Sequence, residues 1–263
     1  MQKVLIVTYY WPPAGGPGVQ RWLYFAGYLR EFGIEPVIYT PENPNYPLRD
    51  DSLVQQLPEG IKVYRQKIWE PYRFARLLSR SGTKRISSGI INREKPGLIE
   101  RLMLWVRGNV FIPDARKYWV KPSVRFLSGV MEKEGISTLI TTGPPHSMHL
   151  IGLQLKRLQK IRWIADFRDP WTSIGYHSAL MLNRHTLEKH RQMEADVLKG
   201  ADAIITTSTQ TMGEFKNRTS RPIHVITNGY SVERNTNEQP QGPFTISHIG
   251  SLLSGRNPVS LWT

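Results

Sequence analysis

The sequence predicts an α/β protein whose core is a doubly wound, mostly parallel sheet. Short apolar runs alternate with longer amphipathic stretches along most of its 263 residues, as expected when strands and helices alternate. The chain opens with an apolar run, a loop rich in Gly and Pro, an amphipathic stretch and a second apolar run, which is a β-loop-α-β order. A hydrophobic fraction of 40% with 8 Trp is ample for a packed core.

Seven strands and six helices follow from this alternation. The expected strands are 3–8, 36–40, 61–65, 136–141, 163–166, 203–206 and 224–227. The expected helices are 19–32, 100–110, 118–133, 147–159, 180–199 and 209–217. Pro122 is expected to break its helix near the start, because proline removes a backbone hydrogen bond.

The chain divides into one large domain and the start of another. Residues 1–232 form the Rossmann-like sheet domain, in which an insert at about 69–117 interrupts the alternation. The stretch 233–243 is polar and poor in core-forming residues, as is typical of a linker. Residues 244–263 begin with an apolar run, which we interpret as the first strand of a second Rossmann-like domain.

The net charge of +14 is concentrated in one region. Between residues 70 and 125 there are 13 Lys or Arg and 4 Asp or Glu, interleaved with aromatic residues. Basic side chains attract anionic lipid surfaces, and aromatic rings suit the membrane interface, so we expect an anionic membrane as a partner. Nucleic acid could use the same combination, but no recognition motif supports it and no nucleic-acid partner is predicted. A merely solvated basic surface is the plain alternative.

The location predicted for the protein is cytoplasmic, peripheral at the inner face of the membrane. Cysteine is absent, which excludes disulfides and thiolate metal sites and makes the cytoplasm the simplest assignment. No apolar run approaches the roughly 18 residues that a membrane-spanning helix needs.

The first loop, Ala14 to Gly18, is a candidate binding element. It lies between a strand and a helix, where a parallel sheet presents ligands at its carboxyl edge. Gly15 and Gly16 would let the backbone approach a ligand, and free N–H groups at the helix start favour phosphate. The dinucleotide fingerprint is incomplete, because a third glycine is missing and Thr40 ends the second strand where an acidic residue belongs. A tight turn that only clears the sheet edge is the alternative.

His146 follows another strand and opens the next predicted helix. It would face the same edge as the glycine loop, where its ring could donate to a sugar hydroxyl or a phosphate oxygen. A single histidine at such a place is otherwise a helix-start or core residue.

The loop Asp166 to Trp171 closes the strand at 163–166. One carboxylate would accept hydrogen bonds from a polyol, and Trp171 would be a flat platform for a sugar ring. Arg168, between Asp166 and Asp169, could instead pair with either carboxylate and only hold the loop. Two carboxylates without ligand spacing give little support for a metal, and no metal site is predicted.

These segments resemble the first half of family-4-type retaining glycosyltransferases, which have the GT-B fold of two Rossmann-like domains. The resemblance rests on the motif from Tyr10 to Gln20, on the loop at 166–171, on the turn at 225–230 and on the segment 248–258. It implies an enzyme that transfers a sugar from a nucleotide sugar, the donor substrate, without a further cofactor. The acceptor would be a lipid-linked or cell-surface glycan.

The resemblance also implies roles for individual residues. It places Gly15, Gly16 and Gln20 near the donor diphosphate or the transferred sugar, and makes His146 a contact of that sugar. Arg256 matches the basic residue that holds the diphosphate.

Two departures from the family pattern limit this inference. Ser251 replaces the usual Arg. The Glu-x7-Glu segment that grips the donor is not in the chain, so we expect these 263 residues to be inactive alone.

For the reaction, we expect Asp169 to orient the acceptor hydroxyl. Helix N-termini and basic side chains would stabilise the charge of the leaving diphosphate. A non-catalytic module that binds a glycan, a lipid or a protein remains the main alternative. A nucleotide-dependent oxidoreductase or epimerase is disfavoured by the incomplete glycine fingerprint.

Overall fold

The computed structural model describes residues 1–70, 98–174 and 180–229, together with 243 and 260. The strands are β1 (Gln2–Val7), β2 (Ile34–Pro41), β3 (Lys62–Gln66), β4 (Thr138–Gly143), β5 (Arg162–Phe167), β6 (Ala203–Thr206) and β7 (Ile223–Val225). The helices are α1 (Pro17–Leu29), α4 (Leu98–Asn109), α5 (Lys117–Glu134), α6 (Ser147–Leu158), α7 (Arg184–Gly200) and α8 (Thr209–Lys216), with short 3-10 turns at Arg30–Phe32 and Asp51–Val54.

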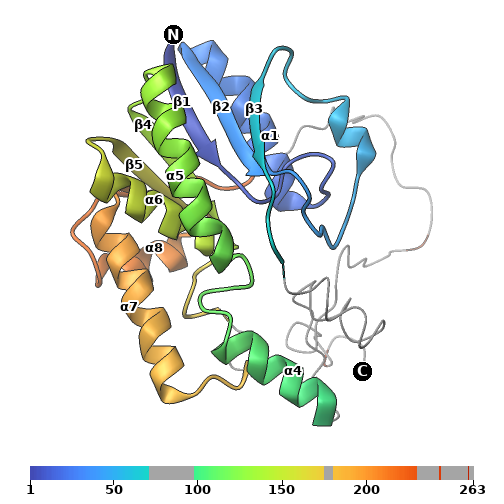
Figure 1. Ribbon diagram of the computed structural model, residues 1–263, viewed down its shortest axis with the longest axis vertical. Helices are drawn as coiled ribbons and strands as arrows, with labels where there is room; N and C mark the ends of the chain where they lie inside the picture. Colours follow the sequence, from blue (N-terminus) through green and yellow to red (C-terminus); the bar gives the residue numbers. More distant parts are fainter. Residues whose placement is uncertain (71–97, 175–179, 230–242, 244–259, 261–263) are drawn as a thin grey trace.

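The seven strands form one sheet in the order β3-β2-β1-β4-β5-β6-β7, and every neighbouring pair is parallel. The order reverses direction at β1, since the chain goes from β1 to β2 on one side and then crosses to β4 on the other (Figure 1). The predicted doubly wound α/β architecture is confirmed.

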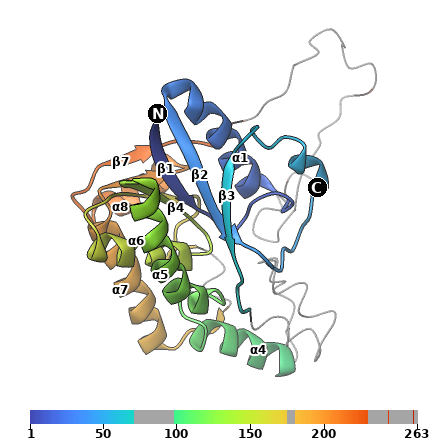
Figure 2. The same ribbon diagram turned by 45° about the horizontal axis from the view of Figure 1, so that its top comes forward.

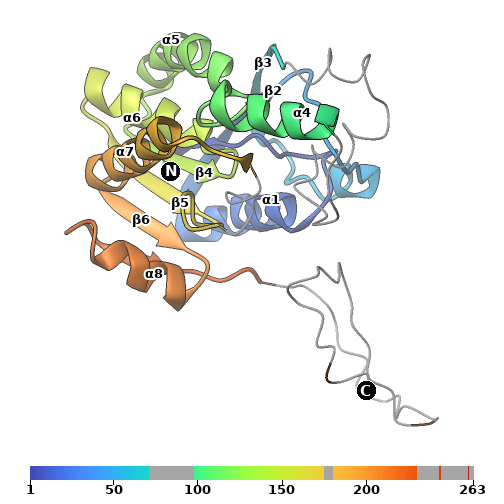
Figure 3. The same cartoon turned by 90° about the horizontal axis from the view of Figure 1, so that it is seen from below.

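Helices cover both faces of the sheet. Seen along the sheet in Figure 3, α1 lies on one face, and α5, α6 and α7 lie on the other. Alternate residues of β1 divide between them: Ile6 packs in the cluster with α1, whereas Leu5 packs in the cluster with the other helices. Burial on both faces explains why the inner strands are rich in apolar residues.

Several element boundaries differ from the prediction by a few residues, and one predicted helix break is absent. Helix α5 runs through Pro122 without a break, and its buried face, which includes Trp119 stacked on Tyr39 at 4.8 Å, stabilises it despite the lost hydrogen bond. Helix α7 starts at Arg184 instead of residue 180, because the Asn183 side chain accepts a hydrogen bond from the Thr186 amide and caps the helix there. Strand β7 ends at Val225, before the predicted end at residue 227.

Some predictions lie outside the described residues. They are the linker at 233–243 apart from residue 243, nearly all of the second-domain start at 244–263, and residues 71–97 of the insert. The described part of the insert contains α4, which lies beyond the carboxyl ends of the strands (Figure 2). None of the helices in the described part combines the length and apolar character that a membrane crossing requires.

Candidate functional site

Three predicted loops meet at one edge of the sheet. They follow β1, β4 and β5, which are neighbours in the sheet and all run in the same direction. In the register, Val7 is opposite Thr141, and Gly143 is opposite Phe167, so the three strands end at nearly the same level. We call the loops 8–18, 143–147 and 166–171 the rim. The rim lies where the strand order reverses, which is the usual ligand-binding position in open α/β sheets.

Arg168 joins the three loops of the rim. Its Nη2 donates a hydrogen bond to the Pro144 carbonyl, and its backbone N–H donates to the Gly143 carbonyl at 3.0 Å. Its Nη1 lies only 1.6 Å from the place where a Cβ on Gly18 would be. The guanidinium carbon is 5.7 Å from the centre of the Tyr10 ring. One cation therefore contacts the loops after β1, β4 and β5.

The glycine loop has local reasons for its sequence. Gly16 has a φ of 100°, a left-handed backbone conformation that residues other than glycine rarely adopt. A Cβ on Gly15 would come within 2.9 Å of the Leu48 side chain, and the Gly15 N–H donates to the Leu48 carbonyl. Gly18 belongs to the predicted loop, but its specific role was not predicted: its lack of a side chain makes room for Arg168. Gln20 lies exposed on the first turns of α1.

Asp166 points into the protein. Its side chain is fully buried, and its oxygens accept hydrogen bonds from Arg21 Nη2 at 2.9 Å, Trp22 Nε1 at 2.8 Å and Thr142 Oγ1 at 2.8 Å. Arg21 Nε makes a further contact at 3.3 Å, so the pair is bidentate. The position of the loop was predicted, but the carboxylate fastens α1 to β5 and is not turned towards the open edge.

Two rim residues, Trp171 and His146, stack on each other with their side chains turned inward. Their rings are 4.7 Å apart and tilted by 2°, and both residues are buried. The Trp171 indole N–H donates to His190 Nδ1 at 3.0 Å. The backbone N–H groups of Trp171 and Thr172 both donate to the buried Glu194 carboxylate. Trp171 was predicted as a sugar platform, and the structure instead shows it buried, supporting the ring of His146.

Two further histidines near the rim are held neutral. Burial lowers the pKa of His149 to about 3 and that of His190 to about 4. The His149 Nδ1 lies 2.9 Å from Thr141 Oγ1, and its ring stacks on Phe167 at 4.3 Å. These rings are part of the packed support of the loops at neutral pH.

The exposed carboxylate of the rim belongs to Asp169. Burial lowers the pKa of the Arg168 guanidinium, and the negative charges of Asp166 and Asp169 oppose that shift. The nearby start of α6 is occupied by another carboxylate, Asp114, which accepts from the Ser147 backbone N–H at 2.9 Å and from its hydroxyl at 2.8 Å. The role of Asp114 was not predicted, because 33 residues separate it from Ser147 in the sequence.

Arg256 lies outside the described residues. Within the parts of the chain that the structure describes, no group of three His, Cys, Asp or Glu residues is placed to hold a metal ion.

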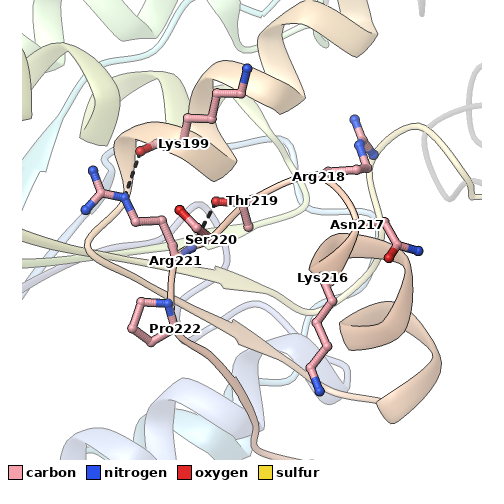
Figure 4. Close-up of a pocket in the computed structure, with 8 residues that line it drawn as sticks. All are labelled: Lys199, Lys216, Asn217, Arg218, Thr219, Ser220, Arg221 and Pro222. Atoms are coloured by element: carbon pink, nitrogen blue, oxygen red, sulfur yellow. Dashed lines mark hydrogen bonds between the residues drawn. The ribbon is translucent and has the colours of Figure 1, made fainter.

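A hollow of about 780 Å³ lies at the opposite edge of the sheet, where β6 and β7 begin. Its four cationic side chains point in different directions in Figure 4, and Arg218 already pairs with Glu194 at 2.7 Å. It offers no convergent set of donors. The residues that line it are Lys199, Lys216, Asn217, Arg218, Thr219, Ser220, Arg221 and Pro222.

Comparison with known proteins gives fold-level likeness only. No protein-family model and no curated protein matches the sequence. Among solved structures, an MnaA–UDP co-structure from S. aureus is similar with 12% identity and a TM-score of 0.46, over 87% of this chain and 44% of that chain. MurG from Acinetobacter baumannii is similar with 13% identity and a TM-score of 0.40, over 92% and 50%.

Sucrose-phosphate synthase from Thermosynechococcus elongatus is a third similar structure, with 14% identity and a TM-score of 0.46 over 86% of this chain and 48% of that chain. The chain spans about half the length of each of these structures. Similarity at this level does not identify an activity.

Proposed function

We propose that the chain is the acceptor-side half of a glycosyltransferase that transfers a sugar from a nucleotide sugar to a lipid-linked or cell-surface glycan. The observation that carries the proposal is the convergence on Arg168 of the loops after β1, β4 and β5. A guanidinium at the start of α1, beside an exposed carboxylate, suits a ligand that carries both a diphosphate and hydroxyl groups.

The proposed roles divide between charge and orientation. The start of α1 at Gly15 and Gly16, Arg168 and, further along the chain, Arg256 stabilise the charge that develops on the departing nucleoside diphosphate. Asp169 accepts a hydrogen bond from the attacking hydroxyl and orients it. Because His146 and Trp171 are buried against each other, their proposed role is to support the loops that contact the transferred sugar. Attack from the face that the diphosphate leaves would retain the configuration at the sugar.

Ligand-induced stabilisation tests this proposal. UDP-, GDP- and ADP-glucose are each added to the full-length protein, and the melting temperature is recorded. A ligand at about 100 times its Kd adds ~2.7 kcal/mol to the free energy of unfolding. We expect one nucleotide class to raise the melting temperature, and Arg168→Met to reduce that rise.

The control is Arg184→Met, since the Arg184 side chain is 93% exposed and lies on α7. It should leave the rise unchanged. If no nucleotide sugar stabilises the chain, or if both variants respond as the unchanged chain does, the proposed sugar transfer at the rim is wrong.

We also propose that the rim side of the sheet faces an anionic membrane surface, the inner face of the cell membrane. Helix α4 lies beyond the carboxyl ends of the strands, on the side of the rim (Figure 1). It exposes Leu98, Leu102 and Trp105 at 84%, 62% and 42% of their surface, and it also carries Arg101 and Arg107. Apolar and basic side chains on one helix favour a charged lipid interface.

A neighbouring groove extends this surface. Trp69 and Tyr118, both about half exposed, meet edge to face at 5.0 Å, and the Lys117 ammonium lies 4.9 Å from the centre of the Tyr118 ring. The groove has a volume of about 340 Å³. Its lining residues are Lys117, Tyr118, Val120, Lys121, Leu150 and Gln154.

Liposome sedimentation tests the membrane proposal. The chain should pellet with vesicles that contain an anionic lipid and should stay in solution with neutral vesicles. Each cation near the surface contributes ~1 kcal/mol, so charge reversal of Lys117 and Lys121 together should reduce binding by more than tenfold. Reversal of Arg184 should not. Equal pelleting on neutral and anionic vesicles would remove the electrostatic argument.

A further inference from the structure

Arg21 is a buried cation whose guanidinium contacts two separate parts of the chain. It lies on α1, and its side chain has no exposed surface. On one side, Nε and Nη2 bind the Asp166 carboxylate at the end of β5. On the other side, Nη1 reaches the segment that follows β7. The rigid fork of arginine allows both sets of hydrogen bonds at once.

The segment 226–228 depends on Arg21. Nη1 donates to the Ile226 carbonyl at 2.9 Å, to the Thr227 carbonyl at 3.1 Å and to Asn228 Oδ1 at 3.2 Å. The side chains of these three residues are exposed, so apolar packing does little to hold them. Among the described residues, the other hydrogen bond shown for this segment runs from the Ile226 N–H to the Thr206 carbonyl at 2.9 Å.

The position of Arg21 is set in turn by the end of β5. Asp166 is fixed by Trp22 and Thr142 as well as by Arg21, and the loop that bears Arg168 and Asp169 begins directly after it. If that loop moves, the Arg21–Asp166 ion pair would transmit the movement to the segment 226–228.

We propose that Arg21 is a positioning residue, which sets the direction in which the chain leaves the sheet after β7 and ties that direction to the loop after β5. The backbone of 226–228 is then oriented relative to the rim. The inference is independent of sugar transfer, because it concerns the chain without substrate.

Spin labelling tests it directly, because the chain has no cysteine and two labels can be introduced cleanly. The labels replace Lys133 on α5 and Thr227, whose side chains are both exposed. The distribution of distances between them is measured by pulsed electron resonance in the 263-residue chain. We expect a narrow distribution that broadens in Arg21→Lys, since an ammonium can pair with Asp166 but cannot also reach 226–228. Asp166→Asn should broaden it as well.

The matched control is Arg30→Lys at the end of the same helix, where the arginine pairs with Glu35 at 2.7 Å. It should leave the distribution narrow. Circular dichroism establishes that each variant is folded. If Arg21→Lys does not fold, Asn228→Ala decides, because it removes one acceptor from an exposed position and should still broaden the distribution. An unchanged distribution in a folded Arg21→Lys chain, or in Asn228→Ala if the former is unfolded, overturns the proposal. An unchanged one in folded Asp166→Asn overturns the tie to the loop after β5.

Discussion

Neutralising Asp166 should destabilise the whole domain. Asp166→Asn keeps the size of the side chain but removes the charge that compensates the Arg21 guanidinium. Both side chains are fully buried, and the two groups lie 2.9 Å apart. Removal of one partner from such a pair costs about 3–5 kcal/mol, because the other charge is left buried without compensation. Since the Asn side chain keeps one oxygen that can accept from Arg21, we expect a loss near ~3 kcal/mol, at the lower end of this range.

The assay is equilibrium unfolding in guanidinium chloride, followed by tryptophan fluorescence and circular dichroism. A loss of ~3 kcal/mol is a large share of the roughly 5–15 kcal/mol that stabilises a typical domain. The matched control is Glu188→Gln, whose partner Arg184 is exposed, and it should change the free energy of unfolding by less than ~0.5 kcal/mol. A cost below ~1 kcal/mol for Asp166→Asn would refute the reasoning.

Three further predictions concern Gly18, His149 and Gly152. Gly18→Ala should displace Arg168, because Arg168 Nη1 lies 1.6 Å from the position of the new Cβ. Calorimetry should show that the stabilising nucleotide sugar binds about tenfold more weakly to this variant. An unchanged affinity would exclude Arg168 from the site. Burial lowers the pKa of His149 from 6.5 to about 3 in the folded chain. Below pH 6.5 the imidazole therefore binds a proton in the unfolded chain but not in the folded chain. The free energy of unfolding should then fall by up to about 1.4 kcal/mol for each pH unit from 6.5 towards 3. Urea melts at pH 7 and pH 4 should show less of this fall in His149→Phe, and an identical fall would mean that His149 is not the group responsible. Gly152→Ala should lower the free energy of unfolding by about 1–3 kcal/mol, since its Cβ would come within 2.3 Å of Trp163 Nε1, and a neutral result in thermal melts would show that the indole can move aside.

The fold could be predicted well because its signal is local. The inner strands are mostly buried and rich in apolar residues, and all seven strands were expected close to where they lie. The rim could be predicted for a related reason, since loops after parallel neighbouring strands share one edge. The error at Pro122 arose because tertiary packing of the helix outweighed a local penalty.

Side-chain directions could not be predicted in the same way. Asp166 was correctly placed at the rim, but its partner Arg21 is 145 residues away in the sequence, and the sequence alone does not show that the two meet. Trp171 turns inward because His146, which precedes α6, and His190 and Glu194, both on α7, surround it. The one available signal for Arg21 was its place on the apolar face of α1, between Val19 and Trp22.

The convergence of three loops into one ligand-binding rim is tested most directly by hydrogen–deuterium exchange of the full-length protein with and without the nucleotide sugar that stabilises it. The account predicts slower exchange in peptides that cover 14–20, 143–148 and 166–171, with no change at 199–222. Slower exchange confined to 199–222, or in only one of the three rim segments, would contradict it.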